Sequence, residues 1–147
     1  MQPFPHTYVV AANGAPTGPV PLSAAGLPEI ATTAPPEFDG PGGAWSPETL
    51  LTAAVADCFM LSFRAFSRAS KFEWSALECR VEGVLERIDK VAYFTGFKTT
   101  ARLTLPAGAD EAKARLLLEK AEHGCLIANS LRSERSLEVT LVTGTGP

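Results

Sequence analysis

The chain has 147 residues, of which 46% are hydrophobic and 20% are charged, a composition typical of a globular protein and not of a disordered one. Its formal net charge of −3 and pI near 5.4 argue against a nucleic-acid-binding surface. No Lys or Arg precedes Arg64, so the positive charge lies in the later part of the chain. We expect one domain over residues 1–147 and no nucleic-acid partner.

The amino terminus does not have the features of a targeting segment. Residues 1–6 lack the cationic start and apolar middle of a signal peptide, and we expect neither a membrane span nor a membrane partner. The expected location is cytoplasmic, where cysteines stay reduced unless they have a redox function. Three cysteines without a C-x-x-C spacing, and only two histidines, argue against a zinc site.

The first third of the chain predicts short strands and loops. Thr7–Ala12 is a β-prone run followed by the turn signal Asn13-Gly14. A further strand is predicted within Leu22–Ala31, around a turn at Ala25-Gly26. The Pro- and Gly-rich segment Thr33–Trp45 reads as a loop that leads into the next element.

One long helix is predicted from Ser46 to Arg68. Ser46 suits the cap position, Pro47 suits the first helical position, and Glu48 places negative charge at the positive end of the helix dipole. Cys58 falls on an apolar stripe, and the opposite side of this helix is apolar as well. We therefore expect sheet, another helix or a second subunit to enclose the helix on most sides.

The rest of the chain predicts a hairpin, two helices and a last strand. Residues alternate with period two over 77–86, and a second strand follows a turn near 88–90, with Val91, Tyr93, Phe97, Ala101, Leu103 and Leu105 on one face. An amphipathic helix from Asp110 to Gly124 has Glu122 on its outer face, and Cys125–Leu131 reads as a short second helix. With a final strand over Leu137–Val142, the order predicts an α+β fold with antiparallel sheet packed on helices.

The cysteines are the candidate chemical groups, each with a plainer interpretation beside it. Cys58 is either a small residue packed on an apolar stripe or a nucleophile. Cys125 follows Gly124 at a predicted helix start, where backbone N–H groups stabilise a thiolate, although it could equally be a packed residue. Cys79 lies on the inward face of a strand and is interpreted as core packing.

Together these features resemble the OsmC/Ohr family. The resemblance rests on Pro35-Pro36-Glu37-Phe38-Asp39-Gly40, on Ser46-Pro47-Glu48 leading through Leu50–Asp57 to Cys58, and on Cys125 at the head of a short helix. It covers nearly the whole chain, because the predicted order of strands and helices is also that of the family.

The resemblance implies an OsmC-like α+β fold in which two chains form an intertwined homodimer around their central helices. It also implies a thiol peroxidase for organic hydroperoxides that uses no metal, haem or flavin. Carried over, Cys58 attacks the peroxide, Cys125 resolves the resulting sulfenic acid as a disulfide, and an external dithiol reopens it. Glu48 belongs to the polar network that positions the site.

One alternative stays open. In the family's peroxidases an amino-terminal arginine pairs with the glutamate, whereas this chain has no basic residue before Arg64. An arginine from a distant segment, such as Arg132 or Arg135, is a possible substitute. The alternative function is an OsmC-fold dimer without peroxidase activity that binds a small apolar ligand between subunits. A purely structural or partner-binding dimer is a third interpretation.

Overall fold

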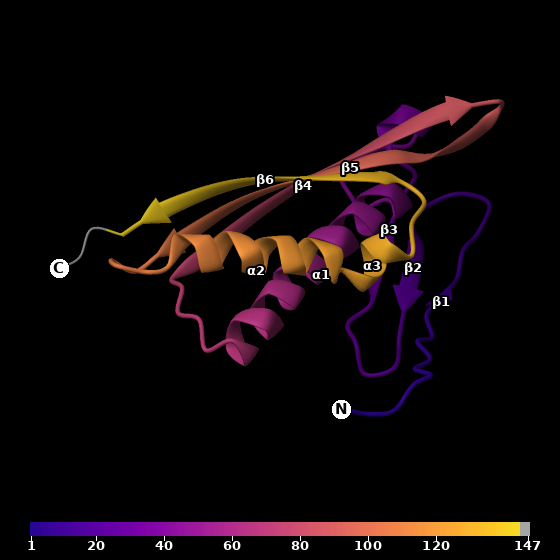
Figure 1. Cartoon of the computed structure of the whole chain (residues 1–147). Coiled ribbons are helices and arrows are strands. Elements are labelled where there is room, and N and C mark those ends of the chain that lie inside the picture. Colours follow the sequence, from indigo (N-terminus) through magenta and orange to yellow (C-terminus); the bar gives the residue numbers. More distant parts are fainter. Residues whose placement is uncertain (145–147) are drawn as a thin grey trace. The chain divides into compact units, whose positions relative to one another are not determined.

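The computed structural model describes residues 1–144 (Figure 1). The chain divides into two compact units, Met1–Leu50 and Leu51 onward, and each is described by itself. The boundary falls within the first turns of helix α1 (Pro47–Ala69), so most of this helix belongs to the second unit. That 1–147 behaves as one domain stays a prediction.

The first unit contains a small antiparallel sheet in the order β1-β2-β3 and one 3₁₀ turn. Its elements are β1 (Ala11–Ala12), β2 (Val20–Ser23), β3 (Ile30–Thr32) and η1 (Pro36–Phe38). The predicted turn at Ala25-Gly26 is confirmed, because the Leu27 N–H donates to the Ala24 carbonyl at 3.1 Å and joins β2 to β3. The predicted first strand over Thr7–Ala12 is shorter than expected, since only Ala11 and Ala12 pair with β2.

Helix α1 starts as its sequence predicts. The Thr49 N–H donates to Ser46 Oγ at 3.2 Å, and the Ser46 N–H donates to Thr49 Oγ1 at 2.8 Å, so the cap is reciprocal. By length and composition alone α1 could cross a membrane, a test that the core helix of a globular protein also passes. Only one side of the helix is buried in this chain, through Val55, Phe59, Phe63 and Ser67, and 17% of its most apolar stretch is buried.

The second unit is built on a long hairpin of β4 (Ala76–Ile88) and β5 (Val91–Leu105). The register shifts between Val84 and Leu85, so that Thr95 is an extra residue opposite them. This bulge brings both Phe94 and Phe97 into one buried cluster, with their rings stacked at 5.0 Å. The sequence predicted that one face of this strand runs without interruption from Val91 to Leu105. That prediction was wrong for the residues that precede the bulge, because the bulge shifts them to the opposite face.

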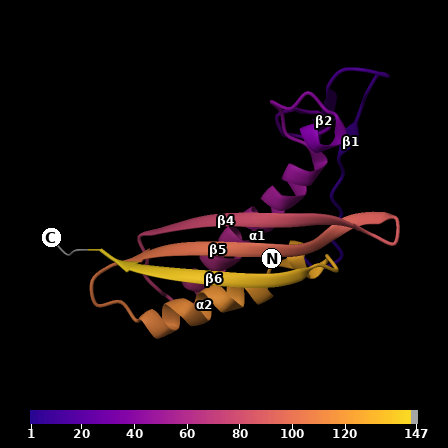
Figure 2. The same cartoon turned by 90° about the horizontal axis from the view of Figure 1, so that it is seen from above.

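The last strand, β6 (Glu134–Thr143), corrects the prediction of an antiparallel sheet. It pairs with β5 in parallel, so the sheet β4-β5-β6 is mixed (Figure 2). The reason is the connection, because helices α2 (Glu111–His123) and α3 (Leu126–Asn129) return the chain to the end of the sheet where β5 began. The α+β class and the long cysteine-bearing helix are confirmed.

Two clusters form the interior of this unit. The larger joins α1, β5 and α2 through the buried residues Phe59, Phe63, Ala101, Leu103, Leu105, Ala114, Leu117, Leu118 and Ala121. The smaller joins α1, β5 and α3 through Val55, Phe97, Cys125 and Ala128, with Cys58 packed against it. The smaller cluster is where the two candidate cysteines lie.

Candidate active site

The structure brings Cys58 and Cys125 together. Cys58 lies in the middle of α1 and is partly exposed, whereas Cys125 caps the start of α3 and is 2% exposed. Cys58 packs against the buried cluster that contains Cys125, and it lies near enough to raise the pKa of the Cys125 thiol; both cysteines are free. Two residues far apart in the sequence therefore lie in one packed cluster, in which Cys125 is a buried member and Cys58 packs against it.

The Cys125 sulfur is held by backbone groups of two helices. It accepts a hydrogen bond from the Ala128 N–H at 3.5 Å, which is the cap interaction of α3. Its own S–H points to the Val55 carbonyl of α1 at 3.9 Å. These contacts orient the thiol between the two helices.

Burial controls the ionisation of Cys125. Loss of water around the sulfur raises its pKa from 9.0 to about 11, and the Ala128 N–H opposes that rise while the hydrogen bond with Cys58 adds to it. The backbone N–H groups of Ala128 and Ile127 lower the pKa of Cys125, as the prediction for a helix start expects, but the effect of burial is larger.

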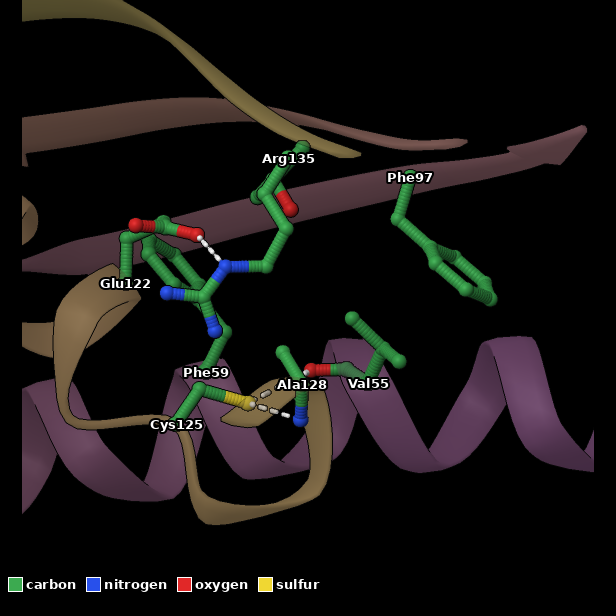
Figure 3. Close-up of a pocket in the computed structure, with 8 residues that line it drawn as sticks. Val55, Phe59, Phe97, Glu122, Cys125, Ala128 and Arg135 are labelled. Atoms are coloured by element: carbon green, nitrogen blue, oxygen red, sulfur yellow. Dashed lines mark hydrogen bonds and ion pairs between the residues drawn. The ribbon is translucent and has the colours of Figure 1, made fainter. Parts of the chain in front are cut away.

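A charged pair lies beside the sulfur. Arg135 of β6 reaches over Cys125, and its Nε donates to Glu122 Oε1 at 2.9 Å (Figure 3). Both side chains are largely shielded, at 22% exposed for Arg135 and 14% for Glu122. The prediction that Glu122 lies on the outer face of its helix was wrong, because the pairing with Arg135 turns it toward the pocket.

The pocket itself is small. Its cavity of about 10 Å³ is enough for roughly one water molecule. It is lined by Val55, Phe59, Phe97, Thr99, Glu122, Cys125, Ala128 and Arg135. A substrate larger than water must therefore approach from the exposed side of Cys58, or the pocket must open.

Two other predicted residues lie in different settings. Glu48 occupies the first turn of α1 and, within the first unit, lines an apolar groove of about 480 Å³ with Val20, Leu22, Thr32, Thr33, Ala34, Pro35, Phe38, Pro47 and Leu50. Its role at the cysteines stays a prediction. Cys79 packs against the larger core cluster, and its pKa is raised to about 11 by burial and by the nearby Cys125, which agrees with a packing role.

Sequence reasoning named Arg135 only as one of two possible cations and missed Glu122 and Thr99. Arg132, the other candidate, instead lies over the Tyr93 ring at 3.8 Å. The parallel pairing of β6 puts Arg135 directly beside Phe97, and an antiparallel sheet would not have predicted this neighbour. Within residues 1–144 no three His, Cys, Asp or Glu side chains gather into a metal-binding group.

Fold and site together define an α+β protein whose long helix carries a cysteine in contact with a second one. Residues 40–140 match the model of the family described as OsmC-like protein, and the chain belongs to this family. It is 28% identical to YmaD of Bacillus subtilis (strain 168) over 71% of this chain and 72% of that one. It is 25% identical to peroxiredoxin OsmC of Escherichia coli (strain K12), over 71% of each chain.

A solved structure supports the same assignment. The chain is similar to a protein from Legionella pneumophila described as an organic hydroperoxide resistance protein OsmC, at 26% identity and a TM-score of 0.72. The similarity covers 92% of this chain and 96% of that one. The chain therefore belongs to a family with an OsmC-like fold, and a relative of the chain is named a peroxiredoxin.

Proposed function

We propose that this protein is a cytoplasmic thiol peroxidase that reduces organic hydroperoxides with Cys58 and Cys125. The observation that carries the proposal is that these two free thiols lie in one packed cluster, close enough for Cys58 to raise the pKa of Cys125. A relative named as a peroxiredoxin, and a similar structure described as an organic hydroperoxide resistance protein, support the substrate class.

The two thiols differ in accessibility, and this difference assigns their order. Cys58 is the more exposed, so it is the one that meets the hydroperoxide. Its thiolate attacks the terminal peroxide oxygen, the O–O bond breaks, and the alkoxide leaves and takes up a proton to become the alcohol. Cys58 is then a sulfenic acid.

Cys125 is buried beside it and serves as the resolving thiol. Its sulfur displaces hydroxide from the Cys58 sulfenic acid, the hydroxide leaves as water with the proton of Cys125, and a Cys58–Cys125 disulfide forms. An external dithiol then reduces this disulfide by exchange and is itself oxidised. Glu48 is proposed to belong to the polar network that positions the site.

The test is stopped-flow reaction of the reduced protein with cumene hydroperoxide. We expect one hydroperoxide consumed per chain, with a Cys58–Cys125 disulfide detected by peptide mass analysis. Cys58→Ser should abolish consumption, Cys125→Ser should leave a trappable sulfenic acid, and Cys79→Ala should behave as the parent. The proposal fails if the reduced parent protein consumes no hydroperoxide.

We also propose that the protein functions as an intertwined homodimer. Large apolar side chains are exposed on α1 and at the hairpin tip, including Leu61 at 51%, Val84, Leu85, Ile88 and Val91. Sedimentation equilibrium should give twice the 15.6 kDa mass of the chain, and a monomer at micromolar concentration would overturn this proposal.

A second function is favoured by the apolar groove of about 480 Å³ in the first unit. A groove of that size suits a small apolar ligand. Binding of a fluorescent fatty-acid probe that saturates, and that survives replacement of both Cys58 and Cys125 by serine, would support ligand binding. If the probe does not bind, the ligand-binding proposal fails and the peroxidase proposal is the one that remains.

A further inference from the structure

The corner that carries Cys125 is tied down by three polar side chains. Asn129 Nδ2 donates to the His123 carbonyl at 3.1 Å, which connects α3 to the end of α2. Arg135 Nη1 donates to Asn129 Oδ1 at 2.7 Å, while Nε of the same guanidinium donates to Glu122 at 2.9 Å. We name Glu122, Asn129 and Arg135 the corner clamp.

Apolar packing restrains this corner on one side only, because Cys125 and Ala128 are buried in the smaller cluster while the rest of α3 is not fully buried. Helix α3 has only four residues, its one fully buried residue is Ala128, and Leu126 is 66% exposed. A helix of one turn has little stability of its own. The clamp therefore supplies contacts that packing does not, and it joins α2, α3 and β6.

The chemistry of a disulfide makes this restraint important. Two cysteines can be joined only when their Cα atoms lie within about 7 Å and their Cβ atoms within about 4.5 Å. Cys58 is held by the long helix α1, so its position does not depend on the clamp. The position of Cys125 does, because it is the residue between α2 and α3.

We propose that Arg135, fixed by Glu122 and Asn129, is a positioning residue that holds Cys125 at bonding distance from Cys58 and so sets the rate of disulfide closure. This rests on the proposed function for its biological meaning. The planar guanidinium is suited to the task because it donates to two acceptors in fixed directions, which a lysine does not reproduce.

The experiment measures Cys58 oxidation and disulfide closure separately. It uses a Cys79→Ala background, in which Cys58 and Cys125 are the only cysteines. Arg135→Met is compared with Arg132→Met, a matched control that removes an exposed arginine over Tyr93 outside the clamp. With cumene hydroperoxide, dimedone traps the Cys58 sulfenic acid, and peptide mass analysis follows the disulfide. With diamide, a two-electron thiol oxidant, closure is measured without any hydroperoxide.

In Arg135→Met we expect disulfide closure to slow by about tenfold or more, since a misplacement near 1 Å can have an effect of that size. Cys58 oxidation should stay within twofold of the parent, so dimedone-labelled protein accumulates. Arg135→Lys should not restore closure, and Arg132→Met should match the parent. A purely structural role would instead slow both steps together with a fall in Tm.

Three results overturn the inference: closure in Arg135→Met within twofold of the control, full rescue by Arg135→Lys, or equal slowing of both steps. If Arg135→Met does not fold, Asn129→Ala removes the same tie and is judged by the same criteria. If the parent consumes no hydroperoxide, the proposed function fails, while the diamide arm still tests the clamp.

Discussion

The Cys125 thiol is surrounded by groups that act on its ionisation in opposite directions. Burial raises its pKa to about 11, and the Ala128 N–H acts against that rise. The sequence placed this residue correctly at a helix start, but it contained no signal for how deeply the sulfur is buried. Burial is a property of the packed cluster with Val55 and Phe97.

A first prediction concerns the pH dependence of Cys125 alkylation. A raised pKa leaves fewer thiolates at a given pH, so at pH 8 alkylation should be about 100-fold slower than for a thiol with a pKa of 9.0. The rate should rise about tenfold per pH unit through pH 10. Iodoacetamide labelling, resolved by peptide mass, measures it, and a plateau below pH 9 would contradict the expectation.

Helix α2 shows that local sequence can determine an element. Asp110 was predicted to start this helix, and its Oδ1 accepts the Lys113 N–H at 2.9 Å, as a cap residue should. Gly124 was predicted to end it, and it does so. The same helix places Glu122 at the cysteine pocket, which no local pattern indicated.

A second prediction tests this cap. Asp110→Ala should lower the free energy of unfolding by about 1 kcal/mol, because the Lys113 N–H loses its acceptor. Asp110→Asn keeps a side-chain acceptor and should retain most of the stability. Urea unfolding followed by circular dichroism compares the three proteins, and equal midpoints for Asp110→Ala and the parent would refute the cap.

A third prediction concerns Gly83 of β4, which lies against the rings of Phe94 and Phe97. A methyl group on Gly83 would lie 2.8 Å from the Phe97 ring, 2.9 Å from the Phe94 ring and 3.0 Å from Thr52 Oγ1. Gly83→Ala should therefore lower the free energy of unfolding by about 1–3 kcal/mol through overpacking. Urea unfolding is the measurement.

Gly96 provides the matched control for that substitution. It lies on the neighbouring strand opposite Val84, and the nearest atom to an added methyl is the Glu134 carbonyl oxygen at 3.8 Å. Gly96→Ala should be neutral or slightly stabilising, since the unfolded chain loses conformational freedom. If both variants lose the same stability, the aromatic contact is not the cause.

At the scale of the whole molecule, the two compact units unfold either together or separately. The chain has two tryptophans, Trp45 in the first unit and Trp74 in the second. If 1–147 is one domain, as predicted, its unfolding is a single cooperative transition, as is usual for domains below 150 residues.

A fourth prediction tests that cooperativity. In each of Trp45→Phe and Trp74→Phe, the fluorescence midpoint in urea should coincide with the circular dichroism midpoint of the same variant. Comparing two signals within one protein cancels any destabilisation that the substitution causes. Distinct midpoints in either variant would show that the units unfold separately, and the single-domain prediction would then be wrong.

The sequence by itself determined the α+β class, the long capped cysteine helix, the hairpin and the start and end of α2, because these follow from caps, turns and periodicity within short stretches. Tertiary structure alone decided the parallel pairing of β6, the bulge at Thr95 and the placement of the Glu122–Arg135 pair beside Cys125, whereas the pairing of Cys58 with Cys125 was implied by the family resemblance. The physical reason is range: a strand's direction and a sulfur's neighbours depend on which distant segments the packed core brings together, and no local pattern encodes that.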